Sequence, residues 1–228
     1  MSVTNLRRVA LFRGLPRAAL RRILDISRTS CLPAGATIFR KNESADRMFV
    51  VLEGRVKIYS QSGARKRKTF AYLQPGDFFG EMAIIDGQER SASAQAVEPS
   101  RLLMIRRADF RRLLDADAGL TRRLLKAVGA RLRRADEEIE SLLFCNVLGR
   151  VARTLDAIVR ECGTRAEDGV RVRRRYTHQE LADLVGTTRE PLSRALGMLR
   201  RAGIAETGQG RILVREPRRL ALLAHGGR

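Results

Sequence analysis

The stretch YTHQELADLVGTTREPLSRALGMLRRAG, residues 176–203, decides the fold of the C-terminal part of the chain. It contains two apolar patterns of helical period with a glycine between them. Residues that start and end helices flank both patterns: Thr177 with Glu180 as a capping box, Gly186 at the junction, Thr187 or Thr188, and Gly203. Two short helices joined at a glycine predict a helix-turn-helix.

The second of these helices carries long polar side chains in its first turns. Arg189 and Arg194 are five residues apart, so they lean toward a similar side of the helix. Arginine suits the guanine edge in the major groove, and a glutamate can accept from cytosine. Hydroxyl and amide groups near helix starts can hold phosphates. The predicted DNA-contacting residues are Thr177, Gln179, Thr188, Arg189, Glu190, Ser193 and Arg194.

A solvated helix surface is the alternative interpretation of this polar face. The apolar residues Leu181, Leu184, Val185, Leu192, Leu196 and Leu199 disfavour it, because they form a core face opposite the arginines. The neighbouring segments complete the prediction: a helix in residues 148–162, a loop in 163–169, a strand in 170–177 and a hairpin around Gly208–Gly210. We therefore predict a winged helix-turn-helix over residues 146–228.

A regular apolar repeat lies between about Arg107 and Phe144, where the chain has no proline. Its members alternate by three and four residues, which makes an a/d seam about three heptads long. The seam consists of Leu125, Val128, Leu132, Ala135, Ile139 and Leu142. This strict spacing favours a helix at 119–145 that pairs with its copy in a second chain. The alternative is an amphipathic helix that packs on its own domain.

Short apolar runs separated by glycine turns fill residues 32–105. The turns are expected at Gly54, at Gly63 and at Pro75-Gly76. Many short strands at this rhythm predict an antiparallel sandwich or barrel. The segment PRAALRRILDIS, residues 16–27, has the period of a helix. The fold class is therefore α+β, with a strand-rich domain over residues 1–118.

The stretch FGEMAIIDGQERSA, residues 79–92, lies at the end of this strand-rich region. It opens with Gly80 and Glu81, and after four apolar residues and a polar turn it delivers Arg90 and Ser91. Taken alone, the Gly80-Glu81 pair is a common turn, and Arg90 could simply pair with Glu81 or Glu89. The spacing nevertheless brings a glycine, an acid, an arginine and a hydroxyl into one segment.

With these motifs in view, nearly the whole chain resembles the cyclic-AMP receptor protein / fumarate-nitrate regulator family of bacterial transcription factors. Residues 176–204 look like the winged helix-turn-helix of that family, whose RExxxR pattern maps onto Arg189, Glu190 and Arg194. The resemblance implies base contacts by these three residues and a palindromic operator with half-sites close to TGTGA. The one-turn spacing of half-sites is a worked example for a founding member of this family and is borrowed from it.

Residues 79–92 are similar to the phosphate-binding cassette of cyclic-nucleotide-binding domains, which sits in a β-roll of jelly-roll type. Gly80 lets backbone N–H groups approach a phosphate closely, and Arg90 neutralises it with a forked set of donors. Ser91 adds a hydroxyl donor. Glu81 suits a ribose 2′-hydroxyl, and a cyclic nucleotide presents both groups side by side. The implied ligand-binding residues are Gly80, Glu81, Met82, Arg90, Ser91, Ala135 and Asp136.

The identity of the nucleotide stays open at this point. In the family, a threonine and a serine on the long helix contact adenine, and the corresponding positions here are Ala135 and Asp136. Asp136 could accept from a purine amine or from guanine N1–H. Cyclic AMP is the leading candidate, with cyclic GMP, cyclic di-GMP and a roll that has lost its ligand as alternatives. Iron–sulfur and haem sensors are disfavoured, because only Cys31 precedes residue 145 and the two histidines are His178 and His225.

Composition limits the remaining classes of function. The net charge of +20 is spread along the chain: residues 1–120 hold 22 basic and 12 acidic side chains, and residues from 146 onward hold 17 and 9. The total charge therefore does not decide the function. Three distant cysteines argue against a disulfide scaffold and a metal site, and no apolar run could span a bilayer.

These observations predict a cytoplasmic, homodimeric DNA-binding regulator that is not an enzyme and that acts on RNA polymerase. No Ser-His-Asp set, metal cluster or Walker loop is present in the sequence. The rival from another class is a nucleotide-binding regulatory subunit that acts through protein contacts. Within the regulator class, the rival is a constitutive DNA binder.

Overall fold

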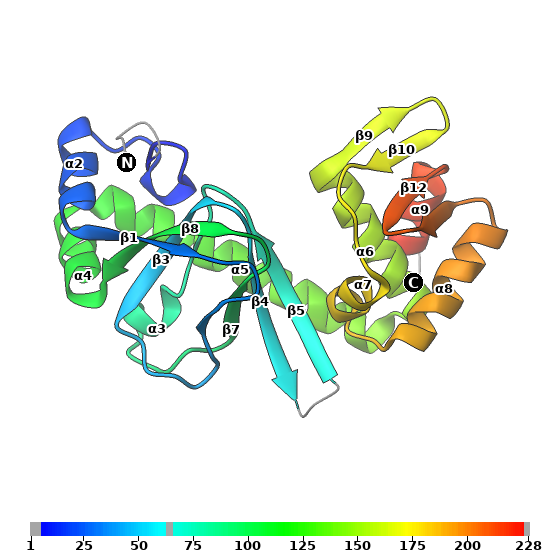
Figure 1. Ribbon diagram of the computed structural model, residues 1–228, viewed down its shortest axis with the longest axis horizontal. Helices are drawn as coiled ribbons and strands as arrows, with labels where there is room; N and C mark the ends of the chain where they lie inside the picture. Colours follow the sequence, from blue (N-terminus) through cyan, green and yellow to red (C-terminus); the bar gives the residue numbers. More distant parts are fainter. Residues whose placement is uncertain (1–5, 63–65, 226–228) are drawn as a thin grey trace. The chain divides into compact units, whose positions relative to one another are not determined.

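The computed structural model describes residues 6–62 and 66–225 (Figure 1). By their internal contacts these residues form two compact units, and each is described by itself. The first unit contains the described residues up to Ser60 and Phe70–Leu132, and the second contains the described part of Gln61–Thr69 and of the chain from Arg133 onward. The chain crosses between the units near residues 60 and 69, and again within a single helix, α5 (Ala118–Phe144). The domain ranges 1–118, 119–145 and 146–228 stay predictions.

The first unit is built on two antiparallel sheets. One has the strand order β1-β8-β3-β6 and the other β2-β7-β4-β5. Their bounds are β1 (Ser27–Leu32), β2 (Thr37–Phe39), β3 (Arg47–Glu53), β4 (Val56–Ser62), β5 (Lys66–Leu73), β6 (Phe78–Phe79), β7 (Ser93–Ala96) and β8 (Ser100–Arg106). The helices that accompany them are η1 (Ala10–Phe12), α2 (Arg17–Asp25), α3 (Met82–Ile85) and α4 (Arg107–Ala116).

Strand β3 shows why this segment forms a central strand. Its residues alternate between two cores, because neighbouring side chains of a strand point to opposite faces. Phe49 and Val51 join a cluster between the two sheets, whereas Met48 and Val50 join a second cluster beneath the helices. Burial on both faces explains the uninterrupted apolar run MFVV. The helical layer, the first sheet and the second sheet therefore stack in that order, which confirms the predicted sandwich-like roll.

Two of the three predicted turns of the roll lie in the described residues, and both are present. Gly54 has φ +78°, and a Cβ there would lie 2.3 Å from the Pro99 carbonyl oxygen, so only glycine fits. The Pro75-Gly76 turn is closed by a hydrogen bond from Asp77 N–H to the Gln74 carbonyl, at 2.9 Å. The turn predicted at Gly63 lies outside the described residues.

A break separates α4 from the long helix α5. Asp117 leaves the helical region, with φ −137° and ψ 96°, and its Oδ1 accepts a hydrogen bond from the Leu120 amide at 2.8 Å. This side chain satisfies one of the free N–H groups at the start of α5. The long helix expected from the apolar repeat is present as α5, Ala118–Phe144.

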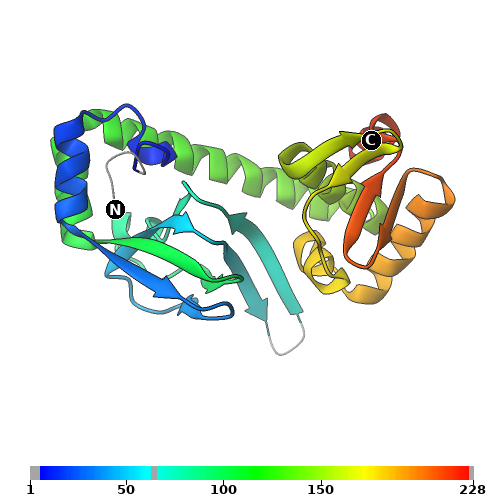
Figure 2. The ribbon, with the colours of Figure 1, turned by 45° about the horizontal axis from the view of Figure 1, so that its top comes forward.

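The part of the second unit that follows α5 combines helices with one sheet of order β11-β12-β10-β9. Its elements are α6 (Val147–Cys162), β9 (Gly163–Ala166), β10 (Gly169–Val172), α7 (His178–Val185), α8 (Arg189–Arg201), β11 (Ala205–Gly208), β12 (Arg211–Val214) and α9 (Pro217–His225). Figure 2 shows β9 and β10 in yellow next to β12 in red. A single core cluster, which includes Val151, Leu181, Leu192 and Val214, joins the helices to this sheet.

In this unit, one prediction was wrong and one helix was not predicted. The segment 163–169 was predicted as a loop, but Gly163–Ala166 forms β9 and pairs with β10. Its sequence, GTRA, has no alternating apolar pattern, so the strand depends on its partner. Helix α9 was not predicted, although Leu220 and Ala224 are buried in the core of this unit. Within the described residues, none of the helices has the length and apolar character needed to cross a membrane.

Candidate functional site

The cassette between β6 and β7 begins with a sharp turn at Gly80. This residue has φ +76°, and a Cβ there would lie 2.6 Å from Nη1 of Arg90. A side chain would therefore be strained and would displace the arginine. Glu81 follows as the N-cap residue of α3, and its carbonyl accepts from the amides of Ile84 and Ile85 at 3.0 Å each. The polar turn after α3 leads back to Arg90.

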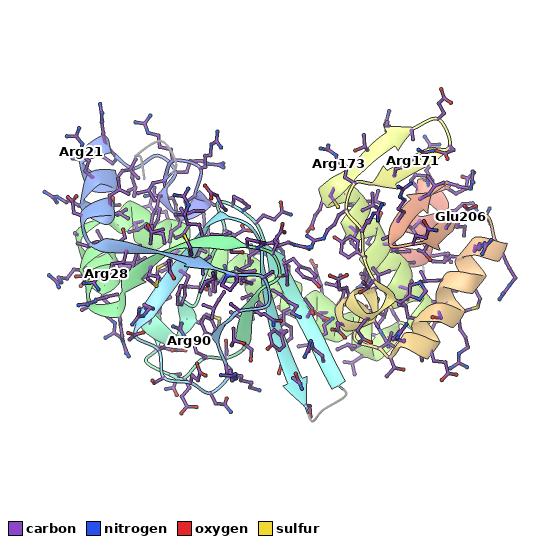
Figure 3. The ribbon with its side chains drawn as sticks, viewed as in Figure 1. Arg21, Arg28, Arg90, Arg171, Arg173 and Glu206 are labelled. Carbon is purple, nitrogen blue, oxygen red and sulfur yellow. The ribbon has the colours of Figure 1, made fainter. Side chains whose placement is uncertain are left out.

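Arg90 is 4% exposed, and its guanidinium is held from two sides by backbone oxygens. Nη1 donates to the Gly80 carbonyl at 2.7 Å, and Nη2 donates to the Arg47 carbonyl at 2.6 Å. Burial lowers the pKa of Arg90 from its ordinary value, and the negative charge of Asp46 acts in the opposite direction. Figure 3 labels this side chain within the first unit.

Glu81 is fully buried, and its carboxylate forms an ion pair with Arg131 of α5. The same guanidinium donates through Nη2 to the Phe78 carbonyl and lies 4.8 Å from the centre of the Phe78 ring. Sequence reasoning missed Arg131, because fifty positions and several elements separate it from the acid that it meets. The only sequence feature that could have indicated Arg131 is its position as a basic residue on the seam helix, directly before Leu132.

Two polar atoms of the cassette are buried without a hydrogen-bond partner among the described residues. They are Nε of Arg90, which is a donor, and Oε2 of Glu81, which is an acceptor. Orphaned buried groups of this kind carry a free-energy penalty of about 1–3 kcal/mol each, more when they are charged. The cassette therefore contains one unsatisfied cationic donor and one unsatisfied anionic acceptor, and Arg90 also binds the carbonyl of Gly80, the residue before Glu81.

The other residues of the predicted ligand set are exposed and are not held by the contacts that join Gly80, Glu81 and Arg90. Met82 is 45% exposed in α3, and Ser91 is exposed directly after Arg90. Ala135 and Asp136 are exposed one turn after Arg131 along α5, beyond the boundary of the first unit. Thus the structure brings Gly80, Glu81 and Arg90 together. Within the described residues, no group of histidine, cysteine, aspartate or glutamate is arranged to hold a metal ion.

The helix-turn-helix has the helix starts and ends that its sequence predicts. The Thr177 hydroxyl accepts from the Glu180 amide at 3.1 Å, and the Thr177 amide donates to the Glu180 carboxylate at 2.7 Å, which confirms the capping box. Gly186 ends α7 in the left-handed region, with φ +74°. Thr188 is the N-cap residue of α8.

Helix α8 separates a core face from a polar face. Leu192, Ala195, Leu196 and Leu199 are buried, whereas Arg189, Glu190, Ser193 and Arg194 are exposed. Arg194 and Glu190 approach to 3.6 Å, and both side chains are mostly exposed, so this ion pair is weak and easily exchanged for other partners. The polar face is therefore free to meet an edge of a nucleic acid.

The residues around α7 complete this polar surface. Thr177, Gln179 and Thr188 are exposed, and the Gln179 amide donates to Asp183 at 2.7 Å. His178 Nδ1 and the Ser193 hydroxyl lie 3.4 Å apart and connect the two helices. The seven predicted DNA-contacting residues thus all belong to α7, α8 or their N-caps.

The hairpin β11–β12 is fixed beside the helix-turn-helix by its turn. The Tyr176 amide, just before α7, donates to the Gly210 carbonyl at 2.8 Å. Gly210 has φ +78°, and a Cβ there would lie 3.3 Å from Cβ of Arg175. The base of the hairpin is braced by an ion pair of 2.9 Å between Arg215 and Glu206, the latter labelled in Figure 3. The hairpin has the position of a wing.

Helix α5 exposes an apolar stripe at the predicted seam. Leu125, Leu132, Ile139 and Leu142 are 66%, 62%, 55% and 48% exposed. Ala135 is also exposed, whereas Val128 packs partly against the core of the first unit. Large, exposed apolar side chains at heptad spacing are typical of a helix that pairs with another chain.

Comparison with known proteins finds a matching family for the region of the cassette and for the region of the helix-turn-helix. Residues 30–117 match the family profile of the cyclic nucleotide-binding domain, and residues 149–223 match that of the Crp-like helix-turn-helix domain. The "Cyclic AMP receptor protein" of Thermus thermophilus is 34% identical over 95% of this chain and 97% of its own length.

The chain belongs to the CRP family.

Solved structures of this family have the same fold. A transcriptional regulator of the CRP/FNR family from Thermus thermophilus is similar with a TM-score of 0.72 and 30% identity, over 86% of this chain and 98% of that one. A c-di-GMP-responsive global regulator of Xanthomonas campestris is similar in fold, with a TM-score of 0.77 and 24% identity, over 87% and 99%. The CRP family consists of transcription regulators and not of enzymes, as the sequence predicted. This CRP-family protein therefore combines a cyclic nucleotide-binding domain with a DNA-binding domain.

Proposed function

We propose that this CRP-family protein is a homodimeric transcription regulator that is controlled by a cyclic nucleotide bound at the cassette, with cyclic AMP as the first candidate. The observation that carries the proposal is the pair of buried, unsatisfied atoms, Nε of Arg90 and Oε2 of Glu81. A phosphate oxygen would accept from the first, and a ribose 2′-hydroxyl would donate to the second. One cyclic nucleotide offers both groups.

Cyclic AMP is placed first because the Thermus relative is named a cyclic AMP receptor protein. Ala135 and Asp136 stand where the family has the threonine and serine that contact adenine, so the base would meet different side chains in this chain. A carboxylate at Asp136 suits a guanine N1–H as well as a purine amine. Cyclic GMP and cyclic di-GMP are therefore tested beside cyclic AMP.

The apolar stripe of α5 supports the homodimer. Four large side chains of this stripe are about half exposed or more, and burying one such side chain is worth about 1.5–3 kcal/mol. A second copy of the same helix offers a matching stripe, since the heptad pattern is self-complementary in a two-fold pair. The proposed interface consists of Leu125, Val128, Leu132, Ala135, Ile139 and Leu142.

DNA recognition is assigned to the polar face of α7 and α8. Arg189, Glu190 and Arg194 would contact base edges of a palindrome with TGTGA-like half-sites, and Thr177, Gln179, Thr188 and Ser193 would contact phosphates or flanking bases. A regulator of this kind acts beside RNA polymerase in the cytoplasm. Ligand control requires that the nucleotide binds the DNA-competent state more tightly than the other state.

Calorimetry with the purified full chain tests the ligand proposal. The wild-type protein, Arg90→Leu and Arg112→Leu are titrated with cyclic AMP, cyclic GMP and cyclic di-GMP. Arg112 is a matched control, because its side chain is 78% exposed and its ion pair is with Asp109 of the same helix, at 3.0 Å. We expect the wild type and Arg112→Leu to bind and Arg90→Leu to lose the ligand. Equal affinity of Arg90→Leu would refute the assignment of the site.

Binding to operator DNA, with and without the ligand found, separates the classes of function. DNA affinity should fall steeply with added salt, because phosphate contacts release counterions. A protein that binds the nucleotide but no palindrome at any salt concentration would instead be a regulatory subunit that acts on proteins. One that binds operator DNA equally with and without nucleotide would be a constitutive DNA binder.

A further inference from the structure

The guanidinium of Arg90 lies over an aromatic ring that the cassette itself does not contain. Its central carbon is 4.2 Å from the centre of the Phe39 ring and 5.7 Å from that of Phe49. Distances below about 6 Å are those of a cation–π interaction, which is strongest when both partners are shielded from water. Phe39 is 9% exposed and Arg90 4% exposed, so the contact is largely desolvated.

The Phe39 ring is itself fixed by two other rings. Its centre lies 5.7 Å from that of Phe49 and 5.9 Å from that of Phe79. Phe49 and Phe79 stack on each other at 5.1 Å. The three rings come from β2, β3 and β6, so both sheets of the roll contribute to the surface under Arg90. A ring packed in this way has little freedom to turn aside.

The partners that hold Arg90 are all uncharged. They are the Gly80 carbonyl, the Arg47 carbonyl and the Phe39 ring. The nearby carboxylates pair with other arginines: Glu81 with Arg131, Asp46 with Arg47 and Glu43 with Arg40. The arginine is thus fixed in place without an ion pair to any residue that the structure describes. Its charge stays available for an anion, and a phosphate does not have to displace a carboxylate first.

The hydrogen-bond donors of Arg90 lead to the same conclusion. A guanidinium has five N–H donors, of which the two carbonyls take one from each terminal nitrogen. The remaining donors include the buried Nε–H, which has no partner within the described part of the chain. The Nε–H and one terminal N–H form the edge that binds two oxygens of a phosphate together. The Phe39 ring takes none of these donors, so the buried Nε–H still lacks an acceptor among the described residues.

We propose that Phe39 is a positioning residue for the phosphate-binding arginine. Its ring holds the Arg90 guanidinium in the plane in which the free donor edge can take two phosphate oxygens. This inference rests on the proposed function, because it assumes that the anion is the phosphate of a cyclic nucleotide. The gain comes from pre-organisation, since an arginine that is already immobile loses little conformational freedom when the ligand binds.

The test compares Phe39→Leu, Phe39→Tyr and Phe12→Leu in the full chain. Phe39→Tyr keeps a ring beneath the guanidinium. Phe12→Leu is the matched control, because Phe12 is fully buried in the other cluster of the same unit and has no contact with Arg90. In calorimetry with cyclic AMP, we expect Phe39→Leu to weaken binding by about 5- to 30-fold. Phe39→Tyr and Phe12→Leu should stay within about twofold of the wild type.

A second measurement does not depend on the ligand. The Nε–H signal of Arg90 is identified in ¹H–¹⁵N spectra by its loss in Arg90→Leu. A ring beneath the guanidinium moves this signal upfield, so Phe39→Leu should return it toward the position of an ordinary arginine, and Phe12→Leu should leave it in place. An unchanged signal in Phe39→Leu would show that the contact does not exist in solution.

The two measurements distinguish the possible failures. A shifted signal together with unchanged nucleotide affinity in Phe39→Leu would overturn the positioning role. A wild-type chain that binds none of the three nucleotides would defeat the proposed function, and the contact between Phe39 and Arg90 would then be judged by its signal alone.

Discussion

The buried carboxylate of Glu81 forms an ion pair with the guanidinium of Arg131, fifty residues further along the chain. The acid belongs to the cassette, and the base belongs to the same helix as the exposed apolar stripe. The cassette of this CRP-family protein, which is the proposed ligand site, is therefore attached to α5 by a side-chain contact as well as by the chain itself.

Replacing Arg131 should destabilise the first unit. Arg131→Leu leaves a fully buried carboxylate without its counterion, and the partial exposure of Arg131 reduces the loss to about 1–3 kcal/mol of unfolding free energy. Urea denaturation measures this loss. Arg134→Leu, at an exposed position of the same helix, is the control and should cost much less. Adding Glu81→Gln to Arg131→Leu should recover part of the stability, and a lack of recovery would contradict the ion pair.

Gly80→Ala should weaken nucleotide binding as well as strain the backbone. The positive φ costs about 1–2 kcal/mol for any residue with a side chain, and the new Cβ would also collide with Arg90. Gly14→Ala separates the two effects, because Gly14 has φ +79° but nothing within 4 Å of the added carbon. Both variants should lose stability in thermal denaturation, whereas only Gly80→Ala should lose nucleotide affinity in calorimetry.

Leu132→Asp should shift the protein from dimer to monomer. The substitution places a charge in the centre of the proposed stripe, where Leu132 is 62% exposed. Leu222→Asp is the matched control, since Leu222 is 69% exposed but belongs to α9 and not to the seam. Sedimentation velocity should show a smaller species for Leu132→Asp alone. Identical behaviour of the two variants would remove the stripe from the interface.

Arg189→Ala should relax specificity at one base pair of the half-site. The loss of a bidentate contact to a guanine costs about 1–3 kcal/mol at that position and leaves other positions unchanged. Competition between operator duplexes with single base changes measures this pattern. A uniform loss on every duplex would instead assign Arg189 to a phosphate.

Asp46 should contribute stability that is lost in acid. Its hydrogen bond with Arg47 lowers the pKa of Asp46 below the ordinary value of 3.8, so the contribution is complete above pH 3.8 and disappears as the pH falls through the lowered pKa. The wild type should therefore exceed Asp46→Asn in stability at neutral pH, and the difference should shrink below about pH 4. A difference that stays constant down to pH 2 would show that the ion pair is not its source.

The helix-turn-helix could be predicted in detail because its signals are local. Thr177 with Glu180 and the left-handed Gly186 act within one or two turns of the chain, so their spacing is visible in the sequence. Gly80, Glu81 and Arg90 were predicted for a similar reason, since one short segment carries all three. The predicted seam residues lie on α5 as expected, but their pairing with a second chain stays a proposal.

What could not be predicted depends on contacts between distant segments. Arg131 and Phe39 meet the cassette from α5 and from β2, and nothing in their own neighbourhoods marks them as partners. The strand β9 exists because β10 lies beside it, and α9 because the core of the second unit covers its apolar side. In each of these cases tertiary packing decides the structure, and local propensity is too weak to reveal it.

Arg131 and Leu132 are neighbours on one unbroken helix, yet the first turns toward Glu81 and the second toward solvent. A ligand that changed the contact between Arg131 and Glu81 would therefore act on a residue adjacent to the proposed dimer interface. Nucleotide binding and dimerisation would then be linked by mass action, so that each would favour or oppose the other. The midpoint of a nucleotide titration should move as the protein is diluted, and the tendency to self-associate should in turn depend on how much nucleotide is present.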